Sequence, residues 1–292
     1  MNNALETINA DAPKGITGRG VGIAILDTGI CPMEDFTLPN NRIAAFKDFV
    51  NNIKKPYDDN GHGTHVAGIA AGNGYLSEGK YCGVAPESSI IALKILDEFG
   101  NGTASSAINA LRWVYKNKDR YNIRVVNLSI GTDDQSISSP LIKAVNALWD
   151  SGIAVVCAAG NDESRGIASP GISPRIITVG SIEEPSVFKI KSKNFVYYKP
   201  DVFAPGENIV SCKAHEFSFT GKRRSADNIV ETNYIRMSGT SMSTPMVSGA
   251  CALMIQHGRG ISPDRVKSLM VNAAYMPGKK GLLNIGRIFY GG

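Results

Sequence analysis

The sequence predicts a three-layer α/β fold, in which a mostly parallel central sheet is covered by helices on both faces. Short, continuous apolar runs, typical of strands buried on both faces, alternate along the chain with segments of helical periodicity. The 292 residues are 43% hydrophobic and 20% charged, which is enough apolar material for a large core. No change of composition marks a linker, so we expect residues 1–292 to form a single domain.

The expected elements follow from the apolar pattern in chain order. Residues 1–20 are polar and glycine-containing, and we expect an N-terminal arm that ends in a turn. Buried strands are expected at residues 21–26, 89–96, 125–131, 153–159 and 176–179. Helices are expected at residues 66–71, 104–115, 141–149 and 266–274, and a further helix is expected to begin at or just after Ser241 and to run through Ile255. This alternation is the pattern of a parallel sheet.

Two further segments fit neither pattern. Residues 183–199 interleave lysines with Phe, Val and Tyr, which suits either a basic-aromatic nucleic-acid surface or a solvated edge hairpin. We favour the hairpin. Residues 213–235 are polar and charged, and we expect a surface loop insertion that acts on access or partner contact.

Charge and cysteine content exclude several classes of function. The net charge of +5 is too small to indicate nucleic-acid binding. No apolar run approaches the length of a membrane helix. The five cysteines are odd in number, widely spaced and without C-x-x-C pairs, which favours reduced thiols. Residues 1–20 show no signal-peptide pattern, so we expect a cytoplasmic protein.

Ser241 begins the segment around which the chemistry is organised. The residues that follow it are apolar or small on every face, which predicts a helix buried all round. Pro245 is tolerated only near the start of such a helix. Ser241 then lies among unpaired N–H groups at the positive end of the helix dipole, which suits a nucleophile whose attack creates an oxyanion. A serine that merely caps a core helix would give the same local pattern.

Two other segments carry candidate functional residues. Asp27 ends the first buried strand, where open α/β sheets place functional groups, although a lone aspartate could instead cap the turn. His62 and His65 lie three residues apart before the helix expected at 66–71. They could be capping or core histidines, and a metal site would need a third ligand that is not found nearby, so no metal site is predicted.

The candidate residues lie in three motifs, Asp27-Thr28-Gly29, Gly61-His62-Gly63-Thr64-His65 and Gly239-Thr240-Ser241-Met242-Ser243-Thr244-Pro245. Taken together, these motifs resemble those of the subtilisin-like serine proteases, in the order Asp, His, Ser that is typical of subtilisin. The resemblance extends over about residues 15–275. The reduced thiols and the missing signal peptide make the chain most similar to the bacterial intracellular subtilisins.

The resemblance implies a subtilisin-like fold and a serine endopeptidase whose catalytic residues are Asp27, His62 and Ser241. His62 would take the Ser241 proton, and Asp27 would orient the imidazole. Asn161 and the Ser241 backbone N–H would form the oxyanion hole, while His65 would be structural. No cofactor is required for this chemistry.

The same resemblance implies peptide and protein substrates, bound as an added strand, with a broad preference for large apolar P1 side chains. The first specificity pocket would have Ala168 near its floor, and a fourth pocket would be lined by Ala104, Ala107 and Ile130. The implied substrate-binding residues are Gly100, Asn101, Gly102, Ser129, Ile130, Gly131, Ala158, Ala159, Gly160 and Ala168.

Two departures from the family pattern affect cation sites. Residues 189–198 replace the usual Phe-Ser-Ser-x-Gly stretch, and the loop at 73–81 lacks the usual calcium-binding pattern. A structural Ca²⁺ is therefore not indicated by the sequence. Nothing in the sequence sets an oligomeric state.

Two other functions are alternatives to a broad endopeptidase. One is a narrow processing protease that matures a particular peptide or proenzyme. The other is a pseudoprotease that serves as a binding scaffold, and the presence of all three triad residues argues against it.

Overall fold

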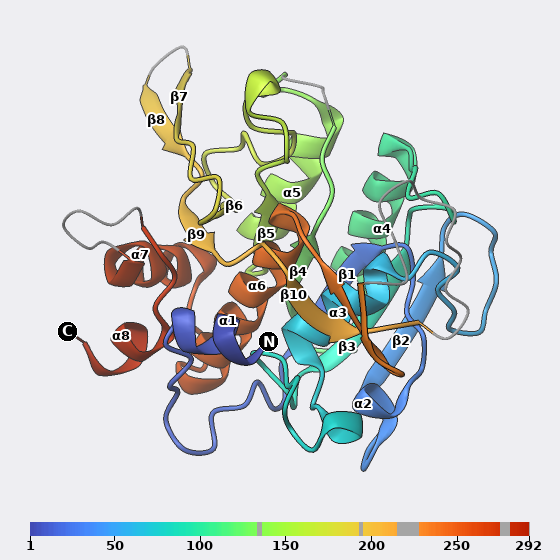
Figure 1. Ribbon diagram of the computed structural model, residues 1–292. Helices are drawn as coiled ribbons and strands as arrows, with labels where there is room; N and C mark the ends of the chain where they lie inside the picture. Colours follow the sequence, from blue (N-terminus) through green and yellow to red (C-terminus); the bar gives the residue numbers. More distant parts are fainter. Residues whose placement is uncertain (133–135, 193–194, 215–227, 275–280, 292) are drawn as a thin grey trace.

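The computed structural model describes residues 1–132, 136–192, 195–214, 228–274 and 281–291. Its centre is a seven-stranded sheet with the strand order β2-β3-β1-β4-β5-β6-β9, and every neighbouring pair is parallel (Figure 1). The strands are β1 (Gly22–Asp27), β2 (Ile43–Asp48), β3 (Ser89–Lys94), β4 (Ile123–Leu128), β5 (Ala154–Ala158), β6 (Ile177–Ser181) and β9 (Val202–Ala204). The expected parallel sheet is confirmed.

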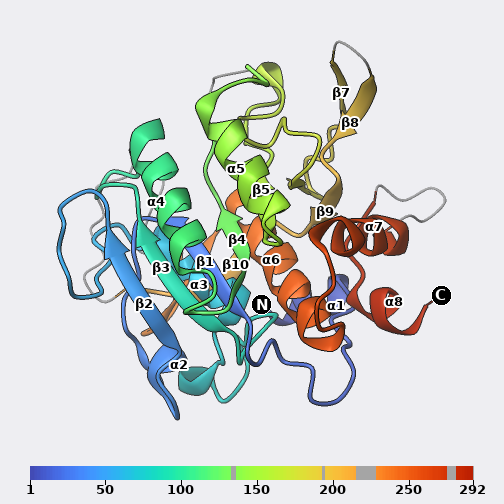
Figure 2. The ribbon, with the colours of Figure 1, turned by 180° about the vertical axis from the view of Figure 1, so that it is seen from behind.

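Helices cover both faces of this sheet, which completes the three expected layers. The helices α4 (Ala104–Asn117) and α5 (Pro140–Asp150) pack side by side on the face seen in Figure 2. The helices α3 (His62–Ala71) and α6 (Thr240–His257) pack together on the opposite face. Other helical segments are α1 (Asn2–Thr7), α2 (Glu34–Thr37), η1 (Tyr75–Ser77), η2 (Glu163–Arg165), α7 (Pro263–Ala274) and α8 (Ile285–Tyr290).

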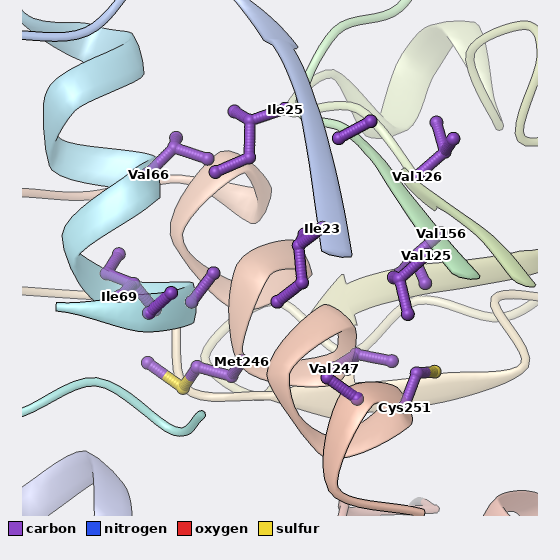
Figure 3. Packing of buried hydrophobic residues seen from close by; sticks show 14 of the residues in the cluster. Ile23, Ile25, Val66, Ile69, Val125, Val126, Val156, Met246, Val247 and Cys251 are labelled. Atoms are coloured by element: carbon purple, nitrogen blue, oxygen red, sulfur yellow. The ribbon is translucent and has the colours of Figure 1, made fainter. Parts of the chain in front are cut away.

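The main core lies between β1, β4 and β5 on one side and α3 and α6 on the other. In Figure 3, Ile23 and Ile25 of β1 point toward Val66 of α3 and Met246 of α6. From Met242 to Ile255, every residue of α6 is buried, as its lack of a polar face predicts. Full burial of one Val, Leu, Ile or Met side chain stabilises the fold by roughly 1.5–3 kcal/mol. The helix that carries Ser241 is therefore one of the most firmly packed elements.

The structure differs from the sequence prediction at two places in the N-terminal part. Residues 1–20 were expected to be an arm, but they begin with α1, whose Ala4 is buried beside Ile8. The sheet also gains β2, within a stretch that looks polar and loop-rich. It is an edge strand with half-buried side chains, so its apolar pattern is weak.

The C-terminal half contains two small antiparallel sheets. The edge hairpin favoured for residues 183–199 is present, formed by β7 (Phe188–Lys191) and β8 (Val196–Lys199). A second sheet has the order β10-β12-β11, with β10 (Ile209–Cys212), β11 (Ile229–Glu231) and β12 (Tyr234–Met237).

This second sheet corrects the loop expected at 213–235. Residues 229–231 form β11, and β12 begins at residue 234, so the C-terminal end of the expected loop is paired backbone. The short, partly exposed β11 carries too few apolar residues to be recognised in the sequence. Residues 215–227 lie outside the described residues. In the part of the chain that the structure describes, no helix is both long and apolar enough to span a bilayer.

All five cysteines are free thiols, and three of them are buried in the core: Cys157, Cys212 and Cys251. Burial raises the pKa of Cys157 and Cys251 from 9.0 to about 12, and that of Cys212 well above 9.0. The neutral thiol is therefore the stable form of these side chains in the folded protein.

We expect Cys157, Cys212 and Cys251 to resist a thiol-exchange reagent at pH 8 in the native state and to react in urea. Because their folded pKa values lie above the unfolded value, their contribution to stability is complete below pH 9 and is lost as the pH rises toward 12. Counting released thiolate chromophore in the two states tests this. Reaction of more than two thiols in the native protein at pH 8 would contradict it.

Candidate active site

Asp27 and His62 are in direct contact at the carboxyl edge of the central sheet. Asp27 is the last residue of β1 and is fully buried, whereas His62 is the first residue of α3. The Asp27 Oδ1 atom lies 2.7 Å from His62 Nδ1 and also accepts a hydrogen bond from the Thr28 backbone N–H at 2.8 Å. The carboxylate thereby makes Nδ1 the protonated ring nitrogen, which leaves Nε2 as the basic one.

Two glycines allow the β1–α3 junction to form. Gly61 precedes the helix in the left-handed region, with φ at 90°, where a side chain would be strained. A Cβ atom on Gly63 would lie 2.3 Å from the Gly29 carbonyl oxygen, so the strand end and the helix start can approach only with glycine there.

The buried carboxylate of Asp58 joins the same two elements. Its Oδ1 atom accepts hydrogen bonds from Thr28 Oγ1 and from the Gly61 N–H, both at 2.8 Å. Its Oδ2 atom accepts from the Thr64 N–H at 2.8 Å and from Thr64 Oγ1 at 2.6 Å. An anion at a helix N-terminus is also favoured by the helix dipole. Asp58 thus fixes the first turn of α3, and with it His62, against the end of β1.

Ser241 lies in the first turn of α6, after Gly239, whose φ of 141° places the chain where glycine is favoured. The Ser241 hydroxyl donates a hydrogen bond to the Ser129 carbonyl oxygen at 3.0 Å. In return, Ser129 Oγ donates to the Ser241 carbonyl oxygen at 3.1 Å. These two bonds join the start of α6 to the segment that follows β4.

Asn161 follows β5 and faces the start of α6. Its Oδ1 atom accepts from the Thr240 N–H at 2.9 Å and from Thr240 Oγ1 at 3.0 Å. Because the Thr240 N–H can only donate, the atom that faces it must be the amide oxygen, which leaves Nδ2 as the donor end of the Asn161 amide. Asn161 and Ser241 line the same pocket.

Two adjoining cavities share the segment Ser129–Gly131. The first, of about 440 Å³, contains His62 and runs between residues 100–102 and residues 129–131. Its lining also includes Ala104, Ala107 and Ile130, which the resemblance assigns to a fourth pocket, together with Leu141. The second, of about 300 Å³, contains Ser241 and Asn161. Because both cavities are lined by Ser129, Ile130 and Gly131, they adjoin each other along this segment.

The second cavity contains most residues expected in the first specificity pocket. Ser129, Ile130, Gly131, Ala158, Gly160 and Ala168 all line it. A Cβ atom on Gly131 would lie 2.5 Å from the Ala168 Cβ, so this wall packs directly on the alanine. Ala159 differs from the expectation, because it packs with Ile142, Ile167 and Ile172 in a separate buried cluster. Ala159 directly follows β5, and its burial in this cluster keeps it out of the pocket lining.

His65 has the structural position that was expected. It is fully buried, and its Nε2 atom lies 3.0 Å from the Ile209 carbonyl oxygen and 3.1 Å from that of Ile235. It thereby ties α3 to β10 and β12.

The described residues contain no group of three or more His, Cys, Asp and Glu side chains arranged to hold a metal ion. The loop at 73–81 is closed by its own hydrogen bonds, and the neighbouring carboxylate of Asp35 accepts from the Leu76 N–H and from the Tyr234 hydroxyl, both at 2.8 Å.

Sequence reasoning missed three residues that shape this site: Asp58, Thr240 and Arg165. Asp58 carried no clear signal, because it lies well before the helix expected at 66–71 and is not in the cap position of α3, which Gly61 occupies. Thr240 lies inside a recognised motif, but its contact with Asn161 joins residues far apart in the chain. Arg165 lines the Ser241 pocket from η2, a short helix with no periodic pattern.

A buried carboxylate that contacts an imidazole, near a serine at a helix N-terminus, is the set of side chains used by serine hydrolases. A model of the subtilase family matches residues 18–287, and the chain therefore belongs to the subtilase family. The resemblance drawn from the three motifs is confirmed.

Three relatives illustrate the similarity. Serine protease AprX from Bacillus subtilis (strain 168) is 40% identical over 277 residues, which cover 88% of this chain and 62% of AprX. Subtilisin Savinase from Lederbergia lenta is 34% identical over 278 residues, covering 94% of this chain and 91% of Savinase. The crystal structure of a cold adapted subtilisin-like serine proteinase superposes with a TM-score of 0.74 at 30% identity, covering 96% and 97% of the two chains. This chain thus spans less than two thirds of the length of AprX.

We expect Asp58→Asn to lower the free energy of unfolding by about 2–4 kcal/mol. The N–H₂ group of the new asparagine would face N–H and O–H groups that now donate to the Asp58 carboxylate. Loss of buried, charge-assisted hydrogen bonds lowers stability by an amount of this order. Urea unfolding followed by fluorescence measures the change. Asp97→Asn is the matched control, because Asp97 Oδ1 accepts from the Phe99 and Asn101 N–H groups in an exposed turn where an amide oxygen can do the same. Equal effects of the two substitutions would show that Asp58 has no special role.

Proposed function

We propose that this chain is a serine endopeptidase that cleaves peptide bonds through Asp27, His62 and Ser241. The observation that supports this most directly is the 2.7 Å contact between Asp27 and His62 in the cleft that also contains Ser241. The relatives named serine protease AprX and subtilisin Savinase support the same reaction class.

In the acylation step, Ser241 Oγ attacks the peptide carbonyl carbon while His62 Nε2 takes the hydroxyl proton. The negative charge moves to the carbonyl oxygen, which accepts hydrogen bonds from Asn161 Nδ2 and from the Ser241 N–H. Asp27 stabilises the imidazolium that results. The intermediate collapses when His62 gives its proton to the leaving amine, which leaves an ester on Ser241.

In the deacylation step, a water molecule takes the place of the amine. His62 removes a proton from this water as its oxygen attacks the ester carbonyl. Collapse of the second tetrahedral intermediate returns the proton to Ser241 Oγ and releases the carboxylic acid. The enzyme is thereby restored.

The shape of the cleft supports a broad preference for large apolar P1 side chains. The pocket beside Ser241 is walled by backbone and small side chains, and its volume of about 300 Å³ can admit a large side chain. The main chain of Ser129–Gly131 supplies edge groups to which a peptide strand can add.

We also propose that the reaction needs no metal, because a neutral imidazole and a helix N-terminus supply the base and the oxyanion donors. We propose a cytoplasmic location on the strength of the five free thiols, which suit a reducing compartment.

Each of the variants Ser241→Ala and His62→Ala should reduce turnover of a chromogenic peptide to near background. The double variant should have about the same turnover as either single variant, because the two side chains act as one unit. The native protein should form a covalent adduct on Ser241 with a fluorophosphonate, detected by mass spectrometry. Substantial peptidase activity in Ser241→Ala, or no adduct on Ser241, would overturn the mechanism, and the second result would favour the scaffold alternative.

Asn161→Leu should lower kcat strongly and change KM little, because the amide binds charge that exists only in the transition state. In subtilisin, removal of the corresponding asparagine lowers turnover by a factor of about 10²–10³. We expect a decrease of the same order here. Steady-state kinetics on one peptide separates the two parameters. A change confined to KM would show that Asn161 binds ground-state substrate instead.

A further inference from the structure

The pocket beside Ser241 has two charged residues among the described residues that line it, Asp162 and Arg165. Both are about half exposed or more, at 51% for the Asp162 side chain and 63% for that of Arg165. They therefore lie at the open side of the pocket, where the end of a long P1 side chain can reach them.

The two side chains form an ion pair within one turn of chain. Arg165 Nε lies 3.0 Å from Asp162 Oδ2, and the Arg165 N–H donates to the Asp162 carbonyl oxygen at 3.1 Å. The 3₁₀ helix η2 brings the two residues to this spacing. Any field that Asp162 exerts on the pocket is thus opposed by a guanidinium a few ångströms away.

Asp162 has a second anchor that does not depend on Arg165. Its Oδ1 atom accepts from the Ser164 N–H at 3.0 Å and from Ser164 Oγ at 2.5 Å. These hydrogen bonds, and after them the charge of Arg165, hold the pKa of the Asp162 carboxyl below its usual value. Asp162 would therefore remain ionised and in place if Arg165 were removed.

We infer that Arg165 is a specificity-determining residue, which cancels the charge of Asp162 at the mouth of the first pocket and so disfavours charged P1 side chains. This inference rests on the proposed function. A basic P1 side chain must compete with Arg165 for Asp162, and an acidic one must compete with Asp162 for Arg165. An uncharged side chain leaves the pair intact.

The ion pair has little importance for folding, because exposed pairs contribute little to stability. Its removal can therefore be tested on a folded enzyme. The test compares kcat/KM for three peptides that differ only at P1, with Leu, Lys or Glu, at low ionic strength.

In Arg165→Ala, the Lys/Leu ratio of kcat/KM should rise about 3- to 10-fold and the Glu/Leu ratio should fall by a similar factor, and 0.5 M salt should reduce both changes. Asp162→Asn should shift both ratios in the opposite direction. The double variant should return them close to the wild-type values, since it has neither charge.

Arg175→Ala is the matched control. Arg175 Nη2 lies 2.5 Å from Asp150 Oδ1 in a pair of similar exposure, 43% and 55%, and neither residue lines the pocket. Both ratios should stay at the wild-type values in this variant.

Unchanged ratios in Arg165→Ala, with cleavage of the Leu peptide retained, would overturn the inference and leave the proposed function standing. Equal shifts in Arg175→Ala would also overturn it, because the effect would then come from net charge. Wild-type protein that cleaves none of the three peptides would overturn the proposed function and this inference with it.

Discussion

The site depends on one constraint, the attachment of the α3 N-terminus to the end of β1. The Asp58 carboxylate binds both elements through four hydrogen bonds, from Thr28 Oγ1, the Gly61 N–H and both donors of Thr64. Asp27 and His62 are the terminal residues of these elements. Their short contact therefore follows from how the backbone is held, and not from the two side chains alone. The buried ammonium of Lys94, which donates to the Thr28 carbonyl oxygen at 2.7 Å, stabilises the same strand end.

A second attachment brings the serine to this edge of the sheet. The reciprocal bonds between Ser129 and Ser241 join the segment after β4 to the start of α6. Behind them, Asn127 Nδ2 donates to Ser129 Oγ at 3.0 Å, and Ser248 Oγ donates to Asn127 Oδ1 at 2.8 Å. The polar groups are paired inside a core that is otherwise apolar, as buried hydrogen-bonding groups must be.

The sequence predicts the features that depend on residues close together in the chain. The runs at 21–26, 125–131 and 153–159 predict central strands because both of their faces are buried, and the motifs around Asp27, His62 and Ser241 are contiguous. Features that depend on distant partners are not visible in this way. The strand β2 is stabilised by an edge position that its composition does not reveal. The orientation of Asn161 depends on Thr240, 79 residues away, and the charge of Asp162 is cancelled by a residue in a turn without periodic pattern.

The burial of residues 242–255 of α6 has a consequence for the dynamics of the protein. Local opening of a helix exposes its amides only if its side chains can leave their packing, and those of residues 242–255 are surrounded on every side. We therefore expect the hydrogen-bonded amides of residues 246–255 to exchange mainly through openings that also disturb the packed strands. Ser241 lies at the half-buried start of this helix, whereas Asp162 and Arg165 lie at the surface. The proposed nucleophile is thus attached to one of the most firmly packed elements of the molecule, and the two charged residues of its pocket are not.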